Sequence, residues 1–159
     1  ATNVSAIGLV GFIERDDEHG DVHVDHCVLH TQIARLNDDA LQAISARSPW
    51  LQFDHSNTAN ATYLANHCQQ CDAMIGAWFI KEPGEVFFPL TDAEVARLTV
   101  EWFDQAIEID DLGGMHSSWI DDLLAPDRER KPVRRKRSSS GCSPSRAIAA
   151  LFSSDFRGR

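Results

Sequence analysis

Apolar and polar residues alternate in two stretches near the N-terminus, and this pattern predicts a pair of β-strands. Residues 4–13 (VSAIGLVGFI) form a β-rich apolar run, and residues 22–26 (VHVDH) alternate with a period of two. A half-buried strand has this period because its successive side chains point to opposite faces. The charged segment 14–21 lies between the two runs and contains Gly20, so we expect the strands to form a hairpin.

A helix is expected next, within residues 33–47. Asn37 is suited to the N-cap position, and the acidic residues 38–39 follow it in the first turn, where the helix dipole favours anions. Leu41 and Ile44 then repeat at helical spacing. Residues 50–53 (WLQF) alternate again, which predicts a short strand, and residues 54–62 are polar and predict a loop.

Two further helices are expected in the second half of the chain. Thr91 and Glu94 match a capping box, and apolar residues continue at helical spacing as far as residue 106. A strand at residues 98–102 is an alternative, because apolar residues also alternate there. After a break at residues 113–114, two serines open a short helix that includes residues 119–124.

A second hairpin is expected between these helices. Residues 74–80 (MIGAWFI) and 86–88 (VFF) are apolar, and residues 82–85 (EPGE) lie between them. The order Pro-Gly is typical of a type II turn, because Pro fixes φ at the second position and Gly permits a positive φ at the third. The sequence therefore predicts two paired strands after residue 73.

Two cysteines separated by two residues, Cys68 and Cys71, come directly before this predicted hairpin. A C-x2-C spacing directs both sulfurs to one centre at the reach of a Zn–S bond. Upstream, Cys27 and His30 form a C-x2-H pair, and the two pairs together supply the four ligands of a tetrahedral site. The sequence predicts one structural Zn²⁺ held by Cys27, His30, Cys68 and Cys71.

Other interpretations of these residues remain open. The fourth ligand could be His23, His26 or His67, although His26 and His67 each adjoin a cysteine and would point the wrong way on a strand. A redox-active C-x2-C pair expects a strand before it and a helix after it, and the pattern here favours neither. Disulfides are disfavoured, because the fourth cysteine, Cys142, sits in a polar tail.

The segment around the cysteines resembles an uncharacterised bacterial family with a zinc-ribbon-like core. The resemblance rests on residues 63–71 (YLANHCQQC), Gly76, Phe79, residues 82–84 and residues 87–88, and it covers about residues 22–90. Members carry a Y-W-A-N-x-C-x2-C segment and an upstream C-x2-C pair. Here Leu64 replaces the Trp, His30 replaces the second upstream Cys, and Asp72 replaces a Gly that often ends the knuckle. The resemblance implies a zinc-ribbon-like fold and no established activity.

Charge divides the chain in two. Residues 1–126 carry 5 Lys and Arg against 21 Asp and Glu, whereas residues 127–159 carry 10 against 3. We therefore expect an α+β domain at 1–126, with a small zinc-ribbon-like β core at about 22–90 and flanking helices. A basic, Ser/Pro-rich and disordered tail is expected at 127–159, with one or two weak helical turns at 145–156.

The expected function follows from the metal site and the tail. No catalytic constellation is found, so a zinc-stabilised binding or interaction module that is not an enzyme is expected, with an unknown protein partner. The alternative is a nucleic-acid-associated protein that binds phosphate backbones through Arg134, Arg135, Lys136 and Arg137. No apolar run approaches the roughly 18 residues of a membrane span, and a cytoplasmic location is expected.

Overall fold

Strands and helices are mixed along the chain, in agreement with the expected α+β class. The structure, a computed structural model, describes residues 2–16, 18–103, 107–124 and 148–156. The strands are β1 (Thr2–Asp16), β2 (Gly20–His30), β3 (Ile33–Leu36), β4 (Leu51–Ser56), β5 (Ala61–His67), β6 (Met74–Ile75), β7 (Thr99–Phe103), β8 (Ile109–Asp111), β9 (Gly114–Met115) and β10 (Ile148–Phe156). The helices are α1 (Asp38–Arg47), α2 (Ala77–Ile80), α3 (Asp92–Val95) and α4 (Ser118–Leu124). None of these helices has the length and apolar character that a bilayer span requires.

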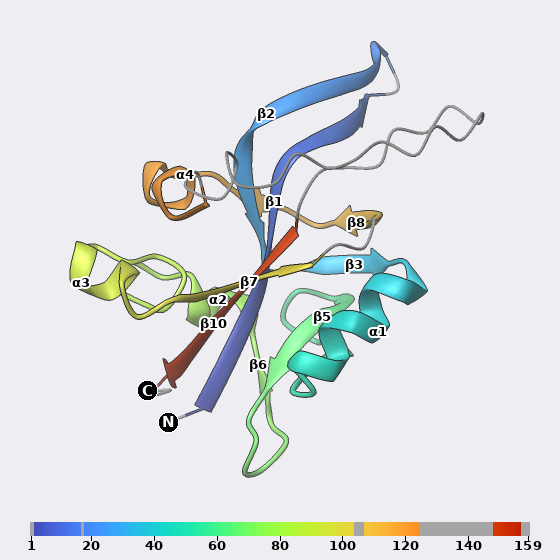
Figure 1. The fold of residues 1–159 in the computed structure, drawn as a ribbon. Coiled ribbons are helices and arrows are strands. Elements are labelled where there is room, and N and C mark those ends of the chain that lie inside the picture. The colour runs from blue at the N-terminus through green and yellow to red at the C-terminus, as the bar shows by residue number, and fades with distance from the viewer. Residues whose placement is uncertain (1, 17, 104–106, 125–147, 157–159) are drawn as a thin grey trace.

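A five-stranded antiparallel sheet forms the centre of the molecule, with the strand order β7-β10-β1-β2-β9. The long strand β1 lies in its middle, paired with β10 along one edge and with β2 along the other. Two smaller sheets accompany it, the ribbon β3-β8 and the three-stranded sheet β4-β5-β6. Figure 1 shows α2, α3 and α4 on one side of the long strands, and α1, β3 and β5 on the other.

Each face of β1 and β2 packs against its own apolar cluster, because the side chains alternate between the two faces. On one face, Val4, Ala6 and Val10 join Cys27 and Leu29, and this cluster continues into α2, α4 and residues 87–98. On the other face, Ile7 and Leu9 pack against residues from β3, α1, β4 and β5. The sheet is therefore buried on both sides around residues 4–10 and 27–30, whereas the outer part of the β1-β2 hairpin, including residues 18–23, is exposed.

Several sequence-based predictions are confirmed. The two N-terminal strands form an antiparallel hairpin, β1-β2, and both are longer than expected. Helix α1 begins after Asn37 and α4 covers residues 118–124. The side chain of Asn37 does not cap α1, however, and its Oδ1 accepts a hydrogen bond from the backbone N–H of Glu108 at 2.9 Å. The expected strand at 50–53 is β4, which extends to residue 56.

The capping box at Thr91 is present, but the long helix predicted after it is not. The Thr91 side chain accepts the Glu94 N–H, and the Glu94 carboxylate accepts the Thr91 N–H. Helix α3 nevertheless ends at Val95, and the chain becomes strand β7 at residues 99–103. The alternative of a strand at 98–102 was thus the better interpretation, because pairing with β10 overrides the helical spacing.

The hairpin predicted at residues 74–88 is wrong. Only residues 74–75 form a strand, and residues 77–80 form the helical turn α2, which buries Ala77 and Ile80 at a spacing of three. The turn at 82–85 is confirmed: the Glu85 N–H donates to the Glu82 carbonyl at 2.9 Å, and Gly84 has φ of +84°. The zinc-ribbon anatomy of a knuckle followed by a hairpin is therefore not present here.

The C-terminal end of the chain differs from the prediction. Residues 148–156 form β10, which lies between β1 and β7, and not one or two helical turns in a disordered tail. Ala150, for example, is aligned with Ile7 on one side and Glu101 on the other. The expected disorder of residues 127–147 lies outside the described residues, as do Arg134, Arg135, Lys136 and Arg137.

Candidate metal centre

The two cysteines of the C-x2-C pair lie in a closed loop between β5 and β6. The backbone N–H of Cys68 donates to the carbonyl of Ala73 at 2.9 Å, and the N–H of Asp72 donates to the carbonyl of Cys68 at 2.8 Å. Asp72 has φ of +57°, a left-handed conformation that Asp adopts more readily than most residues. A turn therefore forms at Asp72 without the Gly that often ends a knuckle, and it folds Cys71 back toward Cys68.

Hydrogen-bond donors surround the sulfur of Cys68. The backbone N–H of Gln70 lowers the pKa of this thiol most, followed by the Thr2 hydroxyl and by the backbone and thiol of Cys71, to about 7. The Thr2 Oγ1 lies 3.6 Å from the Cys68 Sγ. Donors aimed at sulfur favour the thiolate, which is the form that binds metals. Cys68 is partly buried and Cys71 is exposed, so solvent reaches the pair.

Two side-chain amides attach this loop to the edge of β1. Asn66 accepts the backbone N–H of Ser5 at 2.7 Å and donates to its carbonyl at 3.0 Å. Gln69 contacts Asn3 in the same manner, at 3.5 and 3.1 Å. Residues 3 and 5 lie on the part of β1 that precedes its pairing with β2, which begins at Ile7. On that side β1 has no β2 neighbour before Ile7, so the side-chain amides of Asn66 and Gln69 take up its backbone hydrogen bonds. These contacts hold the loop beside Thr2.

Cys27, a predicted ligand, lies in the apolar core and not at a knuckle. It is an internal residue of β2, fully buried, and packs with Val10 and Leu29. Its backbone N–H donates to the Asp121 Oδ1 at 3.1 Å. The expectation that the strand ends at residue 26 is wrong, because β2 continues through Cys27 to His30.

His30, the predicted partner of Cys27, points to the opposite face of β2. Residues three apart on a continuous strand alternate in direction, and His30 is aligned with Ile7, which belongs to the other apolar cluster. Its Nδ1 donates to Asp111 Oδ2 at 2.6 Å, while His30 Nε2 and Asp111 Oδ1 are buried with no hydrogen-bond partner among the described residues. A carboxylate on one ring nitrogen is typical of a metal-ligating histidine, but the C-x2-H pair cannot act as one knuckle.

The four predicted ligands are not brought together. Cys68 lies beside Thr2, whereas Cys27 is aligned with Val10, eight residues further along β1, a separation of about 26 Å at the rise of a strand. His30 is aligned with Ile7, five residues along, or about 16 Å. Within the described part of the chain no three His, Cys, Asp or Glu side chains form a group that could hold a metal ion. Cys27 and His30 are therefore not placed to share a metal ion with Cys68 and Cys71.

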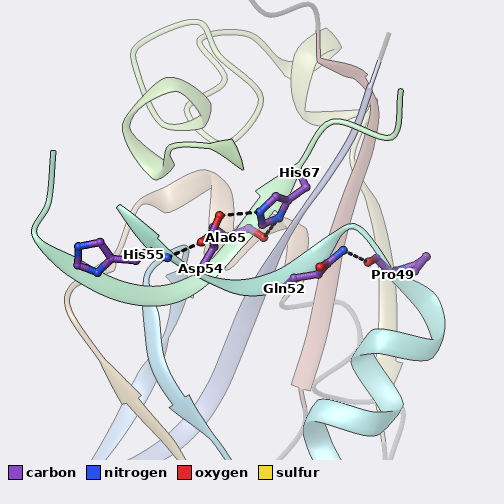
Figure 2. Close-up of polar contacts among 6 residues, drawn as sticks. All are labelled: Pro49, Gln52, Asp54, His55, Ala65 and His67. Carbon is purple, nitrogen blue, oxygen red and sulfur yellow. Dashed lines mark hydrogen bonds and ion pairs between the residues drawn. The ribbon is translucent and has the colours of Figure 1, made fainter. Parts of the chain in front are cut away.

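His67, an alternative fourth ligand, is engaged on both ring nitrogens. Its Nε2 lies 3.2 Å from the Asp54 Oδ2, and its Nδ1 lies 3.2 Å from the carbonyl of Ala65 (Figure 2). The hydrogen bond from His67, followed by the backbone N–H of His55, lowers the pKa of the Asp54 carboxyl. Both ring nitrogens therefore lie next to oxygen atoms of this chain, and within the described residues His67 does not join Cys68 and Cys71 in a group that could hold a metal.

The remaining alternatives, His23 and His26, are exposed on β2. His26 lies against His116, with ring centroids 4.6 Å apart, and His116 Nε2 lies 3.0 Å from Asp121 Oδ2. Neither His23 nor His26 joins the C-x2-C loop in a group that could hold a metal.

The sequence did not predict the His30–Asp111 contact or the hydrogen bonds of the Asn66 and Gln69 side chains with β1. Each of these contacts joins residues more than sixty positions apart, so no local pattern indicates it.

No protein-family model, curated protein or solved structure matches this chain. The resemblance to a zinc-ribbon-like bacterial family therefore stays an expectation.

Proposed function

We propose that the protein is a zinc-binding interaction module without catalytic activity, whose metal is held by Cys68 and Cys71. The observation that carries the proposal is the closed loop in which backbone N–H groups, with the Thr2 hydroxyl, are directed at the Cys68 sulfur. Such donors stabilise a thiolate before the metal arrives, and they leave both sulfurs on one side of a tight turn.

The chemistry of the ligands supports a structural or bridging role for the zinc. Thiolates donate electron density to the ion, which reduces its power as a Lewis acid, and catalytic zinc more often has histidine and carboxylate ligands with an open position for water. Large apolar side chains are also exposed on the described surface: Trp78, Phe79 and Leu90 are each more than half exposed. Exposed apolar residues that gather in one segment are typical of surfaces that bind another macromolecule.

Metal analysis of the protein tests this proposal. Full-length protein purified without added metal is expected to contain zinc, and both Cys68→Ser and Cys71→Ser are expected to lose it. Cys142→Ser is the matched control and is expected to keep the metal. The fold of each variant is checked by circular dichroism in the presence of a chelator, so that loss of a ligand is separated from loss of structure.

The same experiment distinguishes zinc binding from thiol redox chemistry. The pKa of Cys68 is lowered and Cys71 is exposed, which are also properties of a dithiol that forms a disulfide. A protein that is isolated free of zinc, takes up none in a titration, and cycles between dithiol and disulfide in a glutathione buffer would contradict the proposal.

A further inference from the structure

The Cys68–Cys71 loop supplies only half of the coordination that structural zinc requires. Such zinc is almost always four-coordinate and tetrahedral, with its positions filled by protein ligands. Cys27 and His30, which were expected to fill the other two positions, lie about 26 and 16 Å away along β1. We infer that a second copy of this chain completes the site, so that one zinc is bound by Cys68 and Cys71 of each of two chains. This inference rests on the proposed function and adds a partner to it.

The surroundings of the loop offer no further ligand among the described residues. His67 directly precedes Cys68, but it is buried, and its two ring nitrogens each lie 3.2 Å from an oxygen atom, of Ala65 and of Asp54. No third His, Cys, Asp or Glu side chain of the described ranges joins the two sulfurs in a group that could hold a metal. No described residue of this chain is therefore placed to fill the two remaining positions of a bound zinc.

The loop is placed where a second molecule can reach it. Gln69, Gln70 and Cys71 are exposed, and in Figure 1 the green segment between β5 and β6 projects at the lower edge of the molecule, beyond the start of β1. The contacts of Asn66 and Gln69 with β1 hold the loop in place without covering Cys71. The ligand pair is thus both fixed and open to solvent, as a shared metal site requires.

Charge permits this approach. The whole chain has a net charge of −9, so two copies repel each other over long distances. Residues 66–71 (NHCQQC), however, contain no acidic side chain, and Asp72 is the first one after them. The repulsion between the bodies is screened over about 8 Å at physiological ionic strength. Apart from its two thiolates, each loop therefore brings a single carboxylate, that of Asp72, toward the other loop.

Twofold symmetry favours a second copy over another source of thiolates. Two identical loops related by a twofold axis through the metal each give two sulfurs, which together make a tetrahedral site of four cysteines. This closed arrangement uses one surface twice and needs no complementary partner surface. Two thiolates from an unrelated protein, or two small-molecule thiols, are the other possible occupants, and the experiment separates them.

The test is the mass and zinc content of the full-length protein in the same sample. Sedimentation equilibrium and elemental analysis are carried out on the purified chain, first with stoichiometric Zn²⁺ and then with an excess of chelator, without any added thiol. We expect a dimer that contains one zinc for two chains, and a monomer after chelation. Cys71→Ser is expected to remain monomeric with zinc, while Cys142→Ser is expected to dimerise like the wild type.

The possible failures are distinguishable. A monomer that holds one zinc per chain would overturn the inference and leave the proposed function in place. Loss of zinc from Cys142→Ser would also overturn only the inference, because Cys142 of the same chain would then be a ligand. Failure to bind zinc at all would overturn both. Dimerisation that survives the chelator and the Cys71→Ser substitution would also overturn the inference, because the interface would then not depend on the metal.

Discussion

The Cys68 thiol shows how much of the candidate site depends on single hydrogen bonds. Its ordinary pKa would leave it mostly protonated at neutral pH, and the N–H groups and hydroxyl around it lower the pKa to about 7. The C-x2-C spacing was visible in the sequence, but the contribution of Thr2 was not, because 66 positions separate the two residues. At neutral pH a substantial fraction of Cys68 is then the thiolate, the form that binds metals.

We expect the alkylation rate of Cys68 in zinc-free protein to rise with pH around a midpoint near 7. The pKa of this thiol is lower in the folded protein than in the unfolded chain. The thiolate therefore stabilises the folded state fully at pH values above the unfolded pKa, and this stabilisation is lost as the pH falls through about 7. Thr2→Val should raise the midpoint, because it removes a donor to the sulfur. Iodoacetamide labelling followed by peptide mass spectrometry measures this, and a midpoint near the ordinary value of about 8.5 would contradict it.

A second prediction at the residue scale concerns the amide of Asn66. Asn66→Ala leaves the backbone N–H and carbonyl of Ser5 without partners in a buried position, so the free energy of unfolding should fall by about 1–3 kcal/mol. Gln69→Ala is the matched control: it removes the same kind of contact at an exposed site, and the expected change is about 0.5 kcal/mol or less. Urea denaturation measures both, and equal effects would contradict the role given to Asn66.

At the scale of elements, the sequence correctly predicted those helices and strands that depend on contacts between residues close together in the chain. The β1-β2 hairpin, helix α1 and helix α4 follow from alternation, from the acidic first turn and from helical spacing, and they are present. The segment 74–80 was misassigned because a short apolar run does not by periodicity distinguish a strand from a buried helical turn. The predicted Cys27–His30 knuckle failed because β2 continues through it and separates the two side chains onto opposite faces.

Strand β10 gives a prediction at the element scale. Its apolar run at residues 148–152 (IAALF) does not by periodicity distinguish a strand from a helical turn, and its partners β1 and β7 lie far away in the chain. Because β10 has a strand on each side, Ala150→Pro removes a hydrogen bond of the sheet and should lower the free energy of unfolding by about 1–3 kcal/mol. Ala150→Ser keeps the backbone N–H and is the control. Thermal unfolding measures both, and an unaffected Ala150→Pro protein would contradict the place of β10 in the sheet.

At the scale of the whole molecule, an acidic part, residues 1–126, is followed by a basic segment that contains residues 134–137. The elements before and after this basic segment both belong to the folded domain. Helix α4 ends at Leu124, and the chain returns as β10 in the central sheet. A truncation at residue 126 would therefore remove a central strand together with the basic residues, and any loss of binding would be ambiguous. The nucleic-acid hypothesis has to be tested in the full chain by substitution.

If the protein binds nucleic acid through Arg134, Arg135, Lys136 and Arg137, replacing all four by Gln should weaken binding and reduce the salt dependence. The expected slope of log affinity against log salt falls by about one for each phosphate contact removed. Arg15→Gln, which changes an exposed arginine of the body paired with Asp21, is the control and should leave the slope unchanged. A salt titration on a mixed-sequence duplex measures this, and an identical slope in the fourfold variant would exclude the basic segment as the contact.

The central claim is that zinc is held by the Cys68–Cys71 loops alone and not by the Cys27–His30 pair. X-ray absorption at the zinc edge of the full-length protein tests it most directly, because it counts sulfur and nitrogen neighbours of the metal. We expect four sulfur ligands at about 2.3 Å and no imidazole nitrogen. Three sulfurs with one nitrogen at about 2.0–2.1 Å would contradict this account and support the four ligands that the sequence alone predicts.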